Sequence, residues 1–139
     1  MGIFKGSILI VDDDASARGL LLSSLARECY YCVAASTGVD ALDKCAIYHF
    51  DVVILNAVMP RAPAVELLPR LVERCPETQF IVIEPTVDRE AIEEIMRLGA
   101  FDYVTKPLNI PDIVSRVEAA MEKKRPLDRR QPARRGTNS

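Results

Sequence analysis

Short apolar runs rich in β-branched residues recur five times along the chain, and each is separated from the next by a segment long enough for a helix. Runs of this kind are typical of strands buried on both faces, which occur mainly in parallel sheets. The pattern therefore predicts five strands of one sheet. The predicted strands are Ile8–Val11, Tyr31–Ala35, Val52–Leu55, Phe80–Ile83 and a weaker one at Tyr103–Val104.

The intervening segments carry apolar residues at helical spacing. Asp14 and Thr37 are placed to cap the first two helices, and Gly99 follows the fourth as a C-terminal signal. Pro69 lacks a backbone donor, so we expect it to kink or delay the third helix. The predicted helices are 15–28, 37–46, 65–74, 88–98 and a last one that opens at 109–112.

Strand and helix thus alternate five times, which predicts an α/β fold with a parallel sheet between two layers of helices, joined by right-handed crossovers. The 139 residues suit a single domain. A content of 49% hydrophobic and 27% charged residues is typical of soluble domains. No apolar run approaches the roughly 20 residues that cross a bilayer, and no leader opens the chain, so we expect a cytoplasmic protein without a membrane partner.

Charge is divided unevenly along the chain. Residues 123–139 carry seven Lys or Arg side chains against one Asp, a net +6, so residues 1–122 carry −8 of the total of −2. We interpret 6–123 as the folded domain and 124–139 as a basic, disordered tail or linker. A nucleic-acid or membrane-surface binder acting through this tail is an alternative, disfavoured because the tail lacks interleaved aromatic residues and a recognition helix.

Cysteine and histidine offer little chemistry here. Cys29 and Cys32 form a C-x-x-C pair, but no second pair completes a zinc site, and the four cysteines are best interpreted as small apolar residues. His49 is the only histidine, which excludes most metal centres and catalytic triads. We therefore do not expect an enzyme.

Polar residues follow the predicted strands at their carboxyl ends, where parallel sheets form their sites. Asp12 and Asp13 follow the first strand, Asn56 the third, Glu84 the fourth and Lys106 the fifth. An acidic cluster could simply favour a helix N-terminus, but a lysine at another strand end points to an acidic, cation-binding pocket with one positive partner.

Three motifs, in this order and at these separations, resemble the receiver domain of two-component response regulators: ILIVDDD at 8–14, DVVILNAVMP at 51–60 and GAFDYVTKP at 99–107. The resemblance covers 6–123. It implies a flavodoxin-like, doubly wound sheet of order 2-1-3-4-5 in a phosphorelay protein. In that family, an aspartate at the end of the third strand accepts a phosphoryl group from a histidine kinase, with magnesium bound beside it.

The resemblance also implies roles for individual residues. Asp12 and Asp13 would hold magnesium, and Val58 would offer its backbone carbonyl to the same ion. Lys106 would contact the phosphoryl oxygens and form a cis peptide bond with Pro107. These roles are expectations carried over from the family.

The chain departs from the family at the reaction centre. Asn56 occupies the acceptor position, and a neutral amide cannot replace the anionic oxygen that phosphoryl transfer needs. Magnesium should therefore bind weakly or not at all. Glu84 replaces the usual Ser or Thr, and we expect it to pair with Lys106 and hold the switch in one state. Pro63 and the residue after it replace the usual Asp-Gly turn.

These departures predict an atypical receiver, a pseudo-receiver that works as a protein-interaction module without phosphorylation. Its partner, a histidine kinase or an effector protein, would contact the face formed by the fourth helix, fifth strand and fifth helix. That face carries the switch residue Tyr103, and also Asp102 and Arg116, which leave homodimerisation open. The alternative is an orthodox receiver whose acceptor Asp was changed to Asn56.

Overall fold

Five parallel strands form one sheet in the order β2-β1-β3-β4-β5, which confirms the predicted topology. The computed structural model describes residues 3–130. The strands are β1 (Ser7–Val11), β2 (Tyr31–Ala35), β3 (Val52–Asn56), β4 (Gln79–Glu84) and β5 (Asp102–Thr105). The helices are α1 (Ala15–Arg27), α2 (Gly38–Ile47), α3 (Ala64–Arg74), α4 (Arg89–Arg97) and α5 (Ile110–Arg130).

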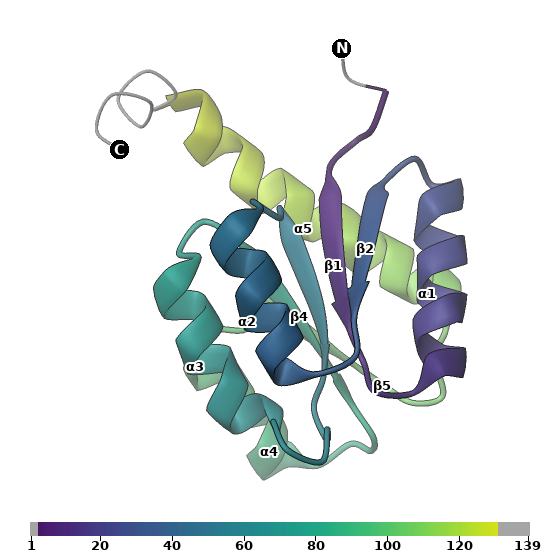
Figure 1. The fold of residues 1–139 in the computed structure, drawn as a ribbon, viewed down its shortest axis with the longest axis vertical. Coiled ribbons are helices and arrows are strands. Elements are labelled where there is room, and N and C mark those ends of the chain that lie inside the picture. The colour runs from purple at the N-terminus through teal and green to yellow at the C-terminus, as the bar shows by residue number, and fades with distance from the viewer. Residues whose placement is uncertain (1–2, 131–139) are drawn as a thin grey trace.

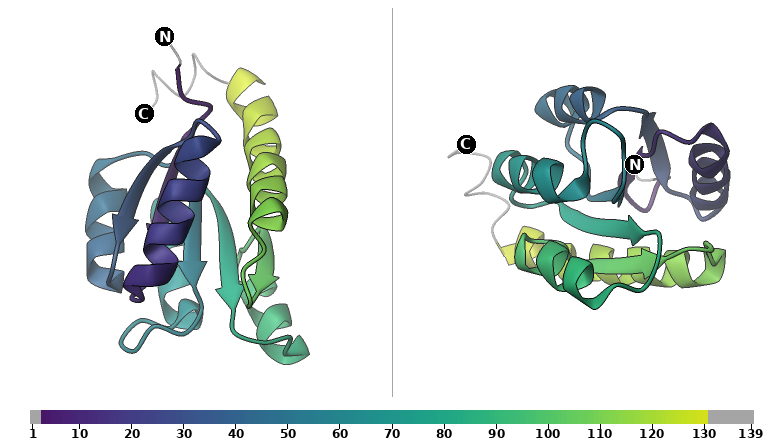
Figure 2. Two further views of the ribbon diagram at one scale, coloured as in Figure 1. Left: turned by 90° about the vertical axis from the view of Figure 1, so that its right-hand side faces the viewer. Right: turned by 90° about the horizontal axis from the view of Figure 1, so that it is seen from below.

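Helices cover both faces of the sheet (Figure 1). Alternate residues of each strand point to opposite faces, so the buried side chains separate into two apolar clusters. One cluster lies beneath α2, α3 and α4, and the other beneath α1 and α5. Figure 2 shows the sheet edge-on between α2 and α5. This double cover explains why the central strands are apolar on both faces.

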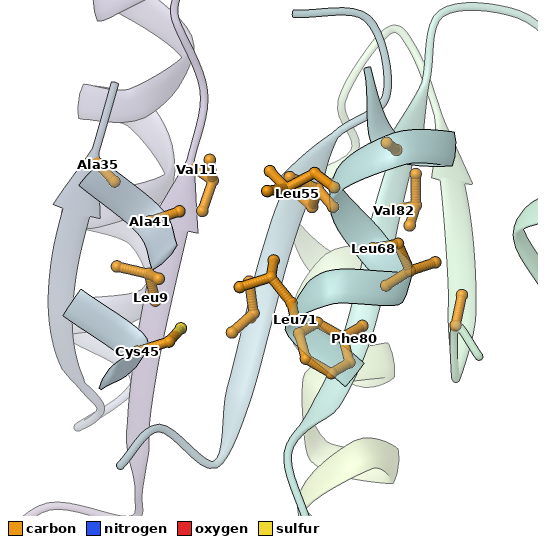
Figure 3. Packing of buried hydrophobic residues seen from close by; sticks show 14 of the residues in the cluster. Leu9, Val11, Ala35, Ala41, Cys45, Leu55, Leu68, Leu71, Phe80 and Val82 are labelled. Carbon is orange, nitrogen blue, oxygen red and sulfur yellow. The ribbon is translucent and has the colours of Figure 1, made fainter. Parts of the chain in front are cut away.

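The cluster under α2 and α3 shows how the helices are held (Figure 3). Leu68 and Leu71 of α3 are fully buried in the cluster that also contains Phe80 of β4 and Leu55 of β3. Burying each such side chain stabilises the fold by about 1.5–3 kcal/mol. Packing of this kind keeps α3 helical through Pro69. The helix begins at Ala64, well before that proline, so the expected delay does not occur.

The helix ends carry the signals expected from the sequence. Asp14 accepts a hydrogen bond from the Ala17 N–H at 3.3 Å, and Thr37 caps α2 in the same way. Gly99 follows α4 with φ at +117°, in the region that favours glycine. α5 extends to Arg130, past the predicted boundary at 123. The rest of the predicted tail, 131–139, lies outside the described residues.

Candidate functional site

The carboxyl ends of β1, β3, β4 and β5 bring the predicted site residues to one edge of the sheet. Asn56 and Glu84 are the last residues of β3 and β4, so each is held in the sheet rather than in a loop. Asn56 lies opposite Ile83 in the register of these two strands. Asp12 follows β1 directly, and its backbone N–H bonds to the Ala35 carbonyl of β2.

Asn56 connects the two aspartates. Its side-chain Nδ2 lies 3.3 Å from Oδ1 of Asp12 and 3.3 Å from Oδ1 of Asp13, and donates a hydrogen bond to each. Asn56 is only 3% exposed and Asp12 only 1% exposed. The amide therefore occupies a position between two carboxylates, where it offsets part of their mutual repulsion.

Two oxygens of this group have no partner. Among the described residues, Asp12 Oδ2 and Asn56 Oδ1 are buried and accept no hydrogen bond. Burial raises the pKa of Asp12 above its ordinary value, while the Asp14 N–H and the charge of Lys106 act in the opposite direction. A buried acceptor without a partner is costly, so a cation or a proton at this point would stabilise the site.

Glu84 is buried beside this site, with 5% of its surface exposed. Burial raises the pKa of its carboxyl group, and the charge of Asp88 raises it further. No ion pair joins Glu84 to Lys106 within the described part of the chain, so the structure does not form the predicted pair. Glu84 lies opposite Thr105, and Lys106 is one position further along, where a strand would turn its side chain to the other face.

Lys106 is exposed and meets Glu84 only through the backbone, where its N–H donates to the Glu84 carbonyl at 3.1 Å. The Lys106–Pro107 peptide bond is cis, as expected. Val58 lies on the loop after β3 with an exposed side chain. Its predicted role through the backbone carbonyl stays a prediction.

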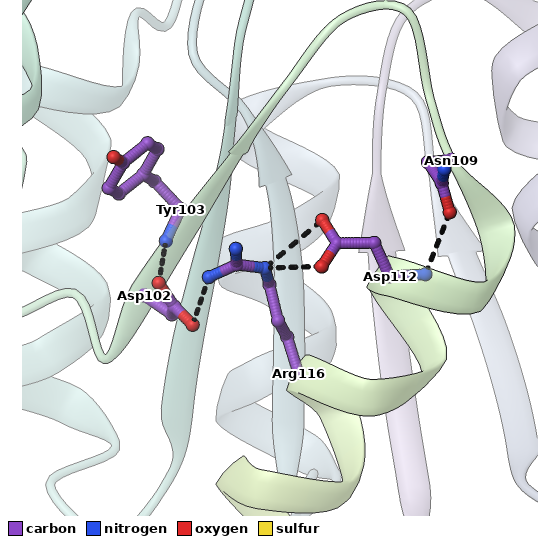
Figure 4. Close-up of polar contacts among 5 residues, drawn as sticks. All are labelled: Asp102, Tyr103, Asn109, Asp112 and Arg116. Atoms are coloured by element: carbon purple, nitrogen blue, oxygen red, sulfur yellow. Dashed lines mark hydrogen bonds and ion pairs between the residues drawn. The ribbon is translucent and has the colours of Figure 1, made fainter.

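The fifth strand carries a network of ion pairs beside the predicted switch residue (Figure 4). The Tyr103 N–H donates to the Asp102 carboxylate at 2.8 Å, and the half-buried Tyr103 ring packs against the cluster beneath α2, α3 and α4. Asp102 accepts from Arg116 at 2.7 Å, and Arg116 also pairs with Asp112. These residues pair within one chain, and the role of Tyr103 as a switch is not tested by this arrangement.

A comparison with known protein families identifies this chain by its sequence. The model of the response regulator receiver domain matches residues 8–118, most of the chain. The chain belongs to the response regulator receiver family. Like other members, it is a signal-transduction domain of the two-component type.

Curated relatives of this receiver domain include transcriptional regulators. It is 32% identical over 117 residues to the DNA-binding transcriptional regulator NtrC of Escherichia coli K12, matching 84% of this chain and 25% of NtrC. It is 31% identical to the alkaline phosphatase synthesis regulator PhoP of Bacillus subtilis, matching 84% of this chain and 48% of PhoP. The chain thus spans between a quarter and a half of the length of these relatives.

Solved receiver structures have the same fold. A CheY-like receiver domain from Methanospirillum hungatei JF-1 matches 86% of this chain and 96% of its own, with a TM-score of 0.82 and 24% identity. The BeF3-activated DrrB receiver domain matches 84% of this chain and 97% of its own, with a TM-score of 0.78 and 30% identity. The flavodoxin-like fold predicted from the sequence is confirmed.

The site offers a hard cation a reduced set of ligands. The carboxylates of Asp12 and Asp13, including the unpartnered Oδ2 of Asp12, and the unpartnered amide oxygen of Asn56 are hard ligands of the kind magnesium prefers. Among residues 3–123, whose side chains the structure describes, no group of three or more His, Cys, Asp or Glu side chains is arranged to hold a metal. Magnesium, when bound in a receiver, neutralises charge on the transferred phosphoryl group. In this chain, Asp12 and Asp13 would hold it.

One contact at the site escaped the sequence analysis. Arg18, in the first turns of α1, donates through Nη1 to the backbone carbonyl of Asp12 at 2.8 Å. The position of Arg18 in the sequence could have indicated this contact, because a long side chain four residues after the N-cap Asp14 can reach back to the residues before the helix. Arg18 thereby fixes the backbone that carries the acidic pair.

No helix in the described residues is long and apolar enough to span a membrane.

Proposed function

We propose that this receiver domain has lost phosphoacceptance at residue 56 and acts as a protein-interaction module that does not depend on phosphorylation. One observation carries the proposal. The residue at the acceptor position is an amide, buried at the end of β3, whose Nδ2 donates to both Asp12 and Asp13. This geometry directs a hydrogen-bond donor, not a nucleophile, toward the acidic pair.

Phosphoryl transfer needs an anionic oxygen in line with the leaving group, and the family supplies it with a carboxylate. The lone pairs of an amide are delocalised, and Asn56 carries no charge to direct at phosphorus. Glu84 adds a second difference, because its buried carboxylate replaces a hydroxyl that would bond a phosphoryl oxygen. Both differences act against phosphorylation of this site.

Magnesium should bind to this domain more weakly than to a receiver with three carboxylates. Asn56 contributes a neutral ligand, and its Nδ2 already occupies one oxygen of each aspartate. A cation would have to compete with these two hydrogen bonds. The expected result is weak or undetectable binding.

The partner is a protein, a histidine kinase or an effector, and the contact surface is the face formed by α4, β5 and α5. Tyr103 and the Arg116 network lie on this face. A cytoplasmic location and the absence of enzymatic activity follow from the family as expectations. Self-association through the same face is compatible with this proposal. Nucleic-acid binding through the basic tail is disfavoured, because the tail lacks interleaved aromatic residues.

The second candidate function is an orthodox phosphorylatable receiver in which the acceptor Asp was changed to Asn56. The match to the family model over 8–118 and the intact Asp12, Asp13 and Lys106 favour it. Glu84 does not, because a single change at residue 56 leaves it unexplained. The codon in the source gene distinguishes the two.

The proposal is tested by incubation with acetyl phosphate and magnesium, followed by intact mass measurement. We expect no phosphoryl adduct on the native chain. The variants Asn56→Asp and Asn56→Asp/Glu84→Thr restore the acceptor alone and the acceptor with the hydroxyl, and the double variant should be the more reactive. An adduct on the native chain that is lost on substitution of Asp12 or Asp13 would refute the proposal.

A further inference from the structure

A cavity of about 720 Å³ lies between α2, α3 and the loop that joins β3 to α3. The two helices lie side by side on one face of the sheet (Figure 1). Its apolar lining includes Leu42 of α2, Met59 of the loop and Leu67 of α3, all nearly fully buried. The volume falls within the range of about 300–1,000 Å³ that is typical of small-molecule sites.

Three arginines line the same cavity: Arg61 on the loop, and Arg70 and Arg74 on successive turns of α3. All three are exposed at its rim. Among the side chains that the structure describes, those of residues 3–123, none is an ion-pair or hydrogen-bond partner of these three guanidinium groups, whereas Arg18 and Arg116 are both partnered. Three unpaired positive charges beside an apolar floor select for an anion with an apolar body.

The opposite wall restricts the ligand further. Asp43 lines the cavity from α2, and Asp13 lines it at the end nearest the acidic site. A ligand charged over its whole surface would be repelled there. The anionic group must therefore lie on the α3 side, with the neutral part of the ligand against α2.

The loop approaches α2 closely at one point. A Cβ atom on Gly38, the first residue of α2, would lie 2.5 Å from the Cβ of Ala62 on the loop. Gly38 and Ala62 both line the cavity, so the two elements that form this part of its lining are packed against each other.

We propose that this cavity binds a small organic anion with an apolar body, such as an aromatic carboxylate or sulfonate. Its anionic group pairs with Arg70 and Arg74, and its apolar body lies on Leu42 and Leu67. The loop that lines the cavity begins directly after Asn56, so an occupied cavity acts on the end of β3 without phosphoryl transfer. The proposal does not depend on the loss of phosphoacceptance, which the mass experiment tests separately.

The test uses the full chain and 1-anilinonaphthalene-8-sulfonate, an aromatic sulfonate, as the probe. Fluorescence titration should give saturable binding at one site, and amide NMR shifts should concentrate in α2, α3 and the loop. The variant Arg70→Gln/Arg74→Gln should weaken binding about tenfold, the effect of removing two exposed ion pairs. The matched control is Arg89→Gln/Arg97→Gln, which removes two exposed arginines of α4 and should leave affinity unchanged.

A second measurement distinguishes ion pairing of the probe with Arg70 and Arg74 from nonspecific electrostatic attraction to the domain. Added salt should weaken binding to the native chain more than binding to the Arg70→Gln/Arg74→Gln variant. Equal weakening by the control variant, shifts centred on another face, or no saturable binding would each overturn the proposal. Displacement of the probe by an acidic amphipathic peptide, but by no aromatic carboxylate, would also overturn it by assigning the cavity to a protein segment.

Discussion

Replacing Asn56 with Asp should destabilise this domain in the absence of divalent cations. The change puts a carboxylate oxygen where Nδ2 now lies, 3.3 Å from an oxygen of Asp12 and 3.3 Å from an oxygen of Asp13. Two hydrogen bonds are lost, and two repulsive contacts replace them. The variant differs from the native chain by only one amide, so overall packing should be retained.

The magnitude follows from simple electrostatics. Two like charges 4 Å apart repel by about 4 kcal/mol at an effective dielectric constant of about 20. The loss of stability is limited, because one of the carboxyl groups can take up a proton and so avoid the repulsion. Holding an Asp with an ordinary pKa of about 3.9 protonated at pH 7 costs about 4 kcal/mol. We therefore expect Asn56→Asp to lower the free energy of unfolding by about 2–4 kcal/mol at pH 7.

The assay is urea denaturation with and without magnesium, after treatment with a chelator. Millimolar magnesium should restore most of the lost stability in Asn56→Asp and change the native chain little, since binding to the folded state alone stabilises it. Asn109→Asp is the matched control. Asn109 is exposed and accepts a hydrogen bond from the Asp112 N–H, a position where Asp serves as well as Asn, so stability should change by less than about 0.5 kcal/mol.

A native-like stability of Asn56→Asp in chelator would refute this reasoning. It would mean that the Asn56 amide does not offset the charge of the two aspartates. A magnesium effect of equal size on the native chain would contradict it too, because the amide would then not compete with the cation.

Three further predictions concern other parts of the molecule. Glu84→Gln should raise the free energy of unfolding at pH 7, because burial raises the pKa of Glu84 and so makes its charge destabilising. This gain in stability should shrink as the pH falls toward 4.5, and urea denaturation at several pH values measures it. Lys106→Met should change stability by less than about 0.5 kcal/mol and show no coupling to Glu84→Gln in a double-mutant cycle, since the two side chains are not paired. Asp14→Ala should cost about 1 kcal/mol in thermal or urea unfolding by removing the cap of α1, and an unchanged stability would contradict that role.

Local signals were sufficient to predict most of the fold. Val52–Leu55 is apolar at every position and β-branched at three of four, which is typical of a strand covered on both faces, so β3 was predicted within one residue. The cap at Asp14 and the stop at Gly99 depend on neighbouring backbone groups alone. The continuation of α3 through Pro69 could not be predicted, because it depends on tertiary burial rather than on local propensity.

The candidate site was predictable in its membership but not in its contacts. Parallel strands bring their carboxyl ends to one edge, so Asp12, Asn56 and Glu84 were expected there. The pairing of Glu84 with Lys106 was wrong, because strand register places Glu84 opposite Thr105. The donation from Asn56 to both aspartates depends on side-chain distances of a few tenths of an ångström, which spacing along the chain does not report.

The ion pairs on the fifth strand set a condition on any homodimer that uses Arg116. Its guanidinium group already contacts Asp102 at 2.7 Å and Asp112 at 3.1 Å in the same chain. A bridge to a second copy would exchange these intramolecular contacts for equivalent intermolecular ones, with no new ion pair to offset the entropy lost on association. Such a dimer would have to derive its affinity from apolar contact, so salt should alter its dissociation constant only slightly.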